Sequence, residues 1–292
     1  MKPVQFEYDD PRTLDEALDL LARHADSCKV LAGGQSLVPL MNFRLARPDR
    51  LVDINGIDSL AYIRRDDGNL VIGAMSRHAD VEHSEVVAES VPLLAEAIGW
   101  VGHSQIRNRG TVGGSVAHAD PAAELPAVFA ALGATFHIRS KRGSRALSWK
   151  QFFVSEFTTA LAPDELVTEV AVPVTDKSTG SAFVEYARRH GDFALGGAAV
   201  TVKLGRDGRC ERATIALLSA GPAPVRAEAA ERQLQGAVLN ESSIRAAAAE
   251  AVKGLHPTGD LHGSTEYRVT LLRTMTERGL TKAAERAGRG AG

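Results

Sequence analysis

Cysteine is scarce in this sequence. Among its 292 residues only Cys28 and Cys210 carry a thiol, and no Cys-x-x-Cys pair occurs. The chain therefore supplies no four-cysteine zinc or iron–sulfur site by itself. So few cysteines also suit a reducing cytosol.

An excess of charge and long apolar runs are also missing. The 34 basic and 36 acidic residues leave a net charge of −2, which excludes a generally basic nucleic-acid coat and argues against a polybasic membrane binder. No stretch approaches the roughly 18 apolar residues of a membrane span. The first ten residues lack the apolar core and cleavage pattern of a signal peptide. We therefore expect a cytoplasmic protein with no transmembrane segment and no nucleic-acid partner.

The familiar nucleotide and hydrolase signatures are absent as well. There is no G-x-x-x-x-G-K-[ST] and no G-x-G-x-x-G, which argues against a P-loop and against a Rossmann dinucleotide site. No G-x-S-x-G occurs, so a hydrolase nucleophile elbow is unsupported.

The patterns that are present predict an α+β protein in three parts. Residues 1–56 begin with a short strand, and Thr13 with Glu16 then forms a capping box before an amphipathic helix. Residues 57–176 carry further strands and helices. In residues 177–287 three strands precede three helices, which is typical of an α+β domain. Residues 288–292 are expected to form a frayed tail.

Two glycine pairs are the sharpest features. They stand in Ala32-Gly-Gly-Gln-Ser36 and in Thr111-Val-Gly-Gly-Ser115. Paired glycines let successive N–H groups point to one place, which suits phosphate oxygens, and neighbouring hydroxyls add donors. Two such loops suit a diphosphate. The alternative is that each pair marks a tight turn and nothing more.

Other clusters carry a weaker signal. His118, Asp120 and Glu124 could be metal ligands, but their spacing matches no standard site. We expect instead that Asp120 caps a helix whose first residue is Pro121. Arg107 and Arg109 either steer an anionic ligand or are solvated loop charges.

At its glycine pairs the chain resembles the flavoprotein, or medium, subunit of the molybdenum hydroxylases, the family of aerobic carbon monoxide dehydrogenase and xanthine dehydrogenase. The resemblance runs essentially from end to end. It is carried by Ala-Gly-Gly-Gln-Ser-Leu37, Leu51-Val-Asp-Ile54, Gln105-Ile-Arg107, Gly110-Thr-Val-Gly-Gly114, Asp120-Pro-Ala-Ala-Glu124, Gly191-Asp-Phe-Ala194 and Glu266-Tyr-Arg268.

The resemblance implies a fold and a cofactor. Two subdomains would form a vanillyl-alcohol-oxidase-like (PCMH-type) FAD-binding unit, followed by a C-terminal three-stranded sheet with a helical bundle. The two glycine loops would hold the FAD pyrophosphate, and four further residues would contact the adenine, the ribityl or phosphate side and the isoalloxazine. The implied FAD-binding residues are Ala32, Gly33, Gly34, Gln35, Ser36, Val101, Thr111, Val112, Gly113, Gly114, Ser115, Glu124, Leu161 and Phe193.

The chain departs from the family at two positions. Phe193 stands where some members have Tyr, and it could instead be a core residue of the C-terminal sheet. Glu185 stands where several members have Lys near the flavin, so redox tuning is expected to differ.

The function implied by the resemblance is electron transfer. Electrons would pass from a molybdenum-cofactor large subunit through the [2Fe–2S] clusters of a small subunit to FAD on this chain, and on to NAD⁺, a quinone or O₂. No catalytic residue and no metal site is expected on the chain itself. A self-sufficient FAD-dependent reductase or oxidase, or a nucleotide-binding assembly module without turnover, are the alternatives.

Overall fold

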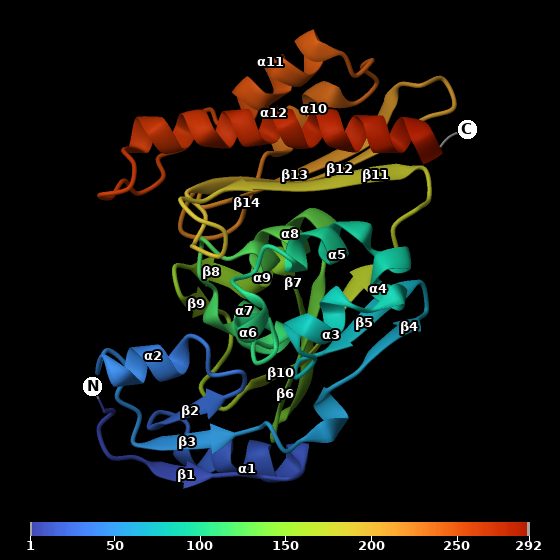
Figure 1. Ribbon diagram of the computed structural model, residues 1–292. Helices are drawn as coiled ribbons and strands as arrows, with labels where there is room; N and C mark the ends of the chain where they lie inside the picture. The colour runs from blue at the N-terminus through green and yellow to red at the C-terminus, as the bar shows by residue number, and fades with distance from the viewer. Residues whose placement is uncertain (1, 291–292) are drawn as a thin grey trace.

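The computed structural model describes residues 2–290. Three main sheets follow one another along the chain, from the N-terminal sheet at the bottom of Figure 1 to the C-terminal sheet at the top. This arrangement confirms the predicted α+β class. The division of the chain at residues 56 and 176 stays a prediction.

The N-terminal sheet is parallel, with strand order β1 (Glu7–Asp9), β3 (Arg50–Asp53), β2 (Cys28–Leu31). Helix α1 (Leu14–His24) begins at the predicted capping box, in which the backbone N–H of Glu16 donates to the hydroxyl of Thr13. Its apolar stripe packs against β3. Helix α2 (Leu37–Asn42) follows directly after β2 and the first glycine pair.

The middle sheet is antiparallel and has five strands. Their order is β4 (Ile63–Asp66), β5 (Asn69–Gly73), β10 (Leu166–Pro173), β6 (Thr135–Ser140), β7 (Gly143–Ser148). Between β5 and β6 the chain forms six helices, α3 (His78–Glu82), α4 (Glu85–Ser90), α5 (Pro92–Ile98), α6 (Ser104–Arg107), α7 (Val112–His118) and α8 (Glu124–Leu132). The shorter elements are η1 (Asp58–Leu60), α9 (Trp149–Phe152), β8 (Phe153–Ser155) and β9 (Thr158–Thr159).

The C-terminal sheet is antiparallel, with order β11 (Thr179–Tyr186), β12 (Gly196–Leu204), β13 (Cys210–Leu218), β14 (Val225–Arg226). The three predicted strands are present, and β14 adds a short edge strand. Helices α10 (Glu228–Leu234), α11 (Glu241–Ala251) and α12 (Thr265–Gly290) follow, and α12 lies along one face of the sheet (Figure 1).

The two faces of the C-terminal sheet pack against different layers. On β11, Ala182 and Val184 face α12, and a Cβ on Gly279 of that helix would lie 3.3 Å from a methyl carbon of Val184. Phe183 faces the opposite way and joins the core around α8, with Ala199 of β12. Because neighbouring residues of a strand point to opposite faces, Glu185 shares the face of Phe183 and so looks toward the middle part of the chain.

Two local predictions were wrong. Helix α8 begins at Glu124 with Ala123 as its N-cap, so Asp120 does not cap it. The Asp120 carboxylate accepts the backbone N–H of Ala122 instead and closes a turn before the helix. Helix α12 continues to Gly290, so residues 288–290 are helical rather than a frayed tail, and residues 291–292 lie outside the described part. No helix among the described residues has both the length and the apolar character that crossing a membrane requires.

Candidate functional site

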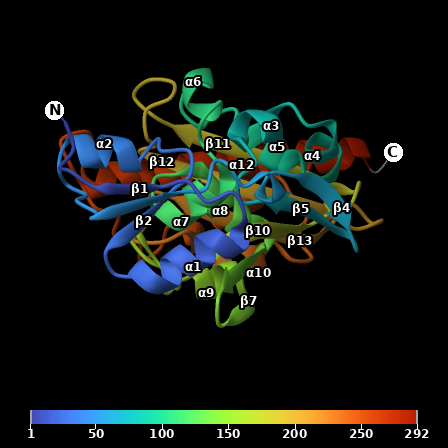
Figure 2. The ribbon, with the colours of Figure 1, turned by 90° about the horizontal axis from the view of Figure 1, so that it is seen from below.

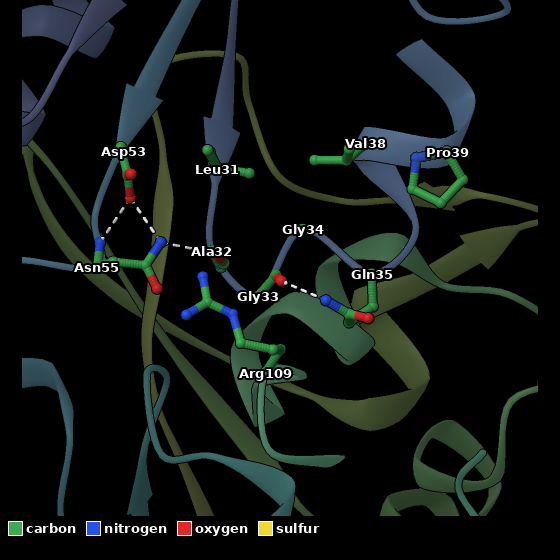
Figure 3. Close-up of a pocket in the computed structure, with 10 residues that line it drawn as sticks. All are labelled: Leu31, Ala32, Gly33, Gly34, Gln35, Val38, Pro39, Asp53, Asn55 and Arg109. Atoms are coloured by element: carbon green, nitrogen blue, oxygen red, sulfur yellow. Dashed lines mark hydrogen bonds between the residues drawn. The ribbon is translucent and has the colours of Figure 1, made fainter. Parts of the chain in front are cut away.

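A cavity of about 350 Å³ lies beside the first glycine pair, where β2 ends. Its walls come from the chain between β2 and α2, from the end of β3 and from the segment after α6 (Figure 3). The lining residues are Leu31, Ala32, Gly33, Gly34, Gln35, Val38, Pro39, Asp53, Asn55 and Arg109. The first predicted loop therefore forms part of a real concavity.

In this first loop the backbone carbonyl oxygens are held by side chains, whereas the backbone N–H groups are left without acceptors in the described chain. The side-chain amide of Asn55 donates to the carbonyl oxygen of Ala32 over 2.8 Å, and that of Gln35 donates to the carbonyl oxygen of Gly33 over 3.0 Å. Gly34 has φ +73°, a left-handed conformation that favours glycine. The N–H groups of residues 33–36 donate to no acceptor within the described chain. They are thus free to bind an anion.

The two predicted loops approach each other closely. A Cβ placed on Gly33 would lie 2.4 Å from the carbonyl oxygen of Arg109 and 2.8 Å from the Cα of Gly110. A Cβ on Gly114 would lie 3.6 Å from the Cβ of Ala32. Position 33 therefore needs glycine, because a side chain would collide with the backbone of Arg109. The two segments that were predicted to share one ligand are neighbours in space.

The second predicted loop differs from the expectation. Its glycines lie in the first turn of α7 and have ordinary negative φ angles. The N–H of Gly113 donates to Ala74, and the N–H of Gly114 donates to the hydroxyl of Thr111. The backbone N–H groups of Val112 and Ser115 are also bonded within the chain. This turn consequently offers hydroxyl groups rather than a row of free amides. Ser115 is half-buried, whereas Thr111 is buried and its hydroxyl already accepts from Gly114.

Arg109 is the cation of the cavity. Its side chain is exposed, makes no hydrogen bond or ion pair with residues 2–290, and reaches toward the first loop between Gly33 and Asn55 (Figure 3). Beneath it, the guanidinium of Arg77 donates to the carbonyl oxygen of Arg109 and to the side chain of Asn55. Burial, together with the charge of Arg109, lowers the pKa of Arg77. The sequence left two interpretations of Arg109 open, an anion-steering residue or a solvated loop charge, and its position in the cavity favours the first.

Arg107, for which the sequence left the same two interpretations open, has a structural role instead. Its Nε lies 2.6 Å from the Glu82 carboxylate, and it also donates to the carbonyl oxygens of Val101 and Gly102. It is neither an anion-steering charge nor a solvated one. It holds the turn after α5, and with it Val101, in place.

A carboxylate completes the floor of the cavity. Asp53 accepts hydrogen bonds from the hydroxyl of Tyr8, over 2.6 Å, and from Asn55. Burial opposes its ionisation, but these hydrogen bonds and the charge of Arg109 outweigh burial and keep the pKa of Asp53 below its ordinary value. The ionised carboxylate orients Asn55, which in turn positions Ala32.

The remaining predicted residues lie where the C-terminal sheet meets the middle part of the chain. Phe193 stands in the loop between β11 and β12 with 67% of its surface exposed, so it is not a core residue. Leu161 and Val101 pack at the margin of the core around α8. Two hydrogen bonds of Ser219, just after β13, connect this region: its N–H donates to Pro121 and its hydroxyl donates to the carbonyl oxygen of Ala194.

Two carboxylates, one buried and one half-buried, lie near this region. Glu124 at the start of α8 is 8% exposed, and Glu185 of β11 has an oxygen that is buried without a partner. Burial raises the pKa of Glu124 to about 7. Burial and the charge of Glu124 raise the pKa of Glu185 to about 8. Nothing in the sequence pattern marks these two residues as a pair.

The metal alternative for His118, Asp120 and Glu124 is not supported. Within residues 2–290 no three His, Cys, Asp or Glu side chains come together as a metal site requires. His118 packs against Phe157 instead, with ring centroids 5.1 Å apart.

The residues of this chain fit FAD. A diphosphate needs donors and a positive charge, and the free amides of residues 33–36 together with Arg109 supply both. Gly33 lets the first loop lie directly against the backbone of Arg109, so the two segments that would hold the diphosphate are close together. The exposed ring of Phe193 offers an apolar surface for a planar group.

Comparison with known proteins gives matches over nearly the whole chain. Residues 4–175 match the FAD binding domain in molybdopterin dehydrogenase, and residues 181–283 match the CO dehydrogenase flavoprotein C-terminal domain. The chain is 48% identical to the 6-hydroxypseudooxynicotine dehydrogenase complex subunit alpha of Paenarthrobacter nicotinovorans, over 98% of this chain and 97% of that protein. It is 36% identical to the carbon monoxide dehydrogenase medium chain of Hydrogenophaga pseudoflava, over 97% and 98%.

Solved structures agree with the sequence matches. A chain of the carbon monoxide dehydrogenase from Hydrogenophaga pseudoflava superposes with a TM-score of 0.95 at 38% identity, covering 98% of this chain and 99% of that one. A chain of quinoline 2-oxidoreductase from Pseudomonas putida 86 superposes with a TM-score of 0.94 at 40% identity, covering 98% and 99%.

Proposed function

Since the chain belongs to the FAD-binding medium subunits of the molybdopterin dehydrogenases, we propose that it takes electrons from the [2Fe–2S] clusters of a small partner subunit and passes them through FAD to an external acceptor. FAD is its cofactor, and the chain is an oxidoreductase subunit of a multi-subunit molybdenum dehydrogenase complex. The acceptor in this proposal is NAD⁺, a quinone or O₂. The substrate is oxidised on the molybdenum-containing large subunit.

The observation that carries the proposal is the anion cradle beside β2. The free amides of residues 33–36 would bind the pyrophosphate of FAD, and Arg109 would neutralise part of its charge. The hydroxyls of Thr111 and Ser115 would complete the cradle from the side of α7. The cradle is rigid because Asn55 fixes Ala32 and because Gly33 packs on the backbone of Arg109.

The chain's own residues bind, orient and shield the cofactor. Bound FAD supplies the redox chemistry, because its ring system can take up and release electrons. Phe193 would cover one face of that ring system, and Leu161 and Val101 would border its cavity with apolar surface. No side chain of this chain is required to form a bond to the substrate of the complex.

The partner subunits are the finer part of the proposal. A chain that only relays electrons needs a donor and an acceptor within tunnelling distance, so it works inside an assembly. Relatives named as a subunit of a dehydrogenase complex and as medium chains support this arrangement.

The test is a purification from the native host with an affinity tag on this chain. We expect a complex with a flavin absorbance spectrum, an iron–sulfur subunit and a molybdenum subunit, in which added substrate bleaches the flavin. A tagged chain that carries FAD and turns over a substrate at full rate without partners would instead support a self-sufficient reductase or oxidase. A chain that purifies without any flavin, with or without partners, would contradict the proposal.

A further inference from the structure

Glu124 and Glu185 lie on opposite sides of the contact between the middle part of the chain and the C-terminal sheet. Glu185 shares its face of the sheet with Gly197 and Leu218: a Cβ on Gly197 would lie 2.9 Å from the Cβ of Glu185 and 2.6 Å from a methyl carbon of Leu218. Ser219, the next residue after Leu218, donates to Pro121 in the turn that leads into α8. This chain of contacts brings Glu185 to the N-terminal end of α8, where Glu124 stands.

Neither carboxylate is paired with another side chain in the described part of the chain, although the backbone N–H of Glu124 donates to its own carboxylate. Glu124 is more than nine-tenths buried and makes no hydrogen bond or ion pair with another side chain within residues 2–290. One oxygen of Glu185 is fully buried without a donor. Position 197 is a glycine, and any side chain there would collide with the Cβ of Glu185. Two carboxylates without a cationic partner at one contact between sheet and helix are costly to ionise unless something binds to them.

Among the described residues no cation is paired with either carboxylate. Asp120 adds a further negative charge beside Glu124, and burial lowers the pKa of His118 and so favours its neutral form. Glu96 of α5 is already paired with Arg286 at 2.6 Å, and Arg268 of α12 lies on the other side of the sheet and is paired with Asp260. Two neighbouring carboxyl groups that are largely removed from water and have no cation beside them hold one proton rather than two charges.

We propose that Glu124 and Glu185 hold one proton between them and exchange it with bound FAD as electrons enter and leave. The inference rests on the proposed function, since that function places FAD in this chain and delivers its electrons. The inference depends on where the pair lies. Ser219 donates hydrogen bonds to Pro121, in the turn before Glu124, and to Ala194, the neighbour of Phe193. The pair thus lies in the region that holds the exposed ring of Phe193.

The proposed step balances in protons and electrons. Two-electron reduction of a flavin takes up at least one proton. The iron–sulfur clusters of the partner supply the two electrons, an O–H bond of the pair breaks, and an N–H bond forms on the flavin ring. The pair is left with two charges and regains its proton from water. When the electrons leave for the acceptor, the flavin N–H proton is released along the same route.

The first test reads the pair itself, without activity. Infrared spectroscopy of the purified, oxidised complex reports protonated carboxyl groups by their C=O stretch. We expect the wild-type complex to show a protonated carboxyl band at neutral pH that disappears as the pH rises past about 8. Glu185→Gln should remove the part of that band that titrates near pH 8 and leave the part that belongs to Glu124, because burial of Glu124 itself raises the pKa of that residue. Glu89→Gln, at an exposed position of α4, should keep both parts.

The second test follows the entry of electrons into FAD. After rapid mixing of the complex with substrate, the flavin absorbance should decay at least about tenfold more slowly in Glu185→Gln than in wild type. This is less than the roughly 100-fold or more that a fully positioned general acid contributes to a rate. The wild-type rate should fall as the pH rises through the titration of the pair, and the Glu185→Gln rate should not.

The outcomes separate this inference from the proposed function. A complex in which FAD is reduced normally, but in which no protonated carboxyl exists at neutral pH or Glu185→Gln leaves both the band and the rate unchanged, overturns the inference alone. A complex without FAD, or one in which FAD stays oxidised, contradicts the proposed function. The infrared titration can still be read in that complex.

Discussion

Gly33 and Arg109 meet backbone to backbone: a Cβ on Gly33 would lie only 2.4 Å from the carbonyl oxygen of Arg109. This contact joins the loop after β2 to the segment before α7, although 76 residues separate the two positions. It also determines where the Arg109 guanidinium emerges into the cavity. The anion cradle depends on this one approach.

Gly33→Ala is therefore expected to give folded protein with little or no flavin. The added methyl pushes the two segments apart, and the free amides of residues 33–36 lose their common direction. The ratio of flavin absorbance to protein absorbance measures occupancy. Gly99→Ala is the control, because its Cβ would meet only ordinary contacts at 3.7 Å or more. Full FAD occupancy in Gly33→Ala would contradict the role given to this contact.

Arg109→Gln should raise the dissociation constant of FAD about tenfold. A hydrogen bond to a charged group contributes roughly 1.5–3 kcal/mol, and about 1.4 kcal/mol corresponds to one decade in affinity. Because Arg109 is exposed, the difference between wild type and variant should shrink at high salt. Titration of the apo protein with FAD at two salt concentrations measures both effects. Arg206→Gln, in the exposed turn between β12 and β13, should bind FAD like wild type.

Phe193→Ala should weaken FAD binding about tenfold and leave the apo protein as stable as before. The ring is 67% exposed, so its removal takes little from the folded apo chain. With FAD present, the lost contact appears as a lower melting temperature of the holo protein. Phe193→Tyr should keep FAD bound. Equal losses in the apo and holo melting temperatures would show that Phe193 does not contact the flavin.

His78 should make the protein sensitive to acid. Burial lowers the pKa of His78 to about 4, against 6.5 in an unfolded chain, and its Nε2 lies 3.0 Å from the carbonyl oxygen of Thr111. The unfolded chain therefore binds this proton first, so the contribution of His78 to stability is complete above pH 6.5 and is lost as the pH falls toward 4. Urea unfolding over this range should show a decline that is weaker in His78→Gln. A decline of equal size in the variant would assign it to other groups.

Glu124 and Glu185 should act in the opposite direction. Their raised pKa values mean that the folded chain holds protons that the unfolded chain has released. Their contribution is complete below pH 4.5 and is lost as the pH rises toward about 8. Glu185→Gln should flatten the fall in unfolding free energy over that interval. An unchanged pH dependence in this variant would mean that Glu185 ionises normally in the folded chain.

Local signals in the sequence predicted local structure well. The capping box at Thr13 and the glycine pair at Gly33 depend on residues within a few positions, and both have the expected structure. The prediction at Asp120 was wrong because an aspartate before a proline suits a turn as well as a helix start, and here it bonds to Ala122. At Gly114, the hydroxyl of Thr111 caps α7 and occupies the amide that was expected to bind phosphate.

What the sequence could not show depends on contacts between distant segments. The sequence does not distinguish Arg107 from Arg109. In the fold, Glu82 lies beside Arg107 and binds it, whereas the path of the backbone places Arg109 in the cavity. The pairing of Glu124 with Glu185 requires the register of β11 against β12 and the placement of the whole C-terminal sheet on α8.

The C-terminal sheet contributes to two hydrophobic cores at once. Its outer face meets α12, while Phe183, Ala199, Ala216 and Leu218 from its inner face complete the core around α8. A core shared in this way couples the melting of both parts. The chain should consequently lose its structure in a single cooperative transition, and a truncation ending at residue 176 would leave the apolar surface of α8 open to water and prone to aggregation.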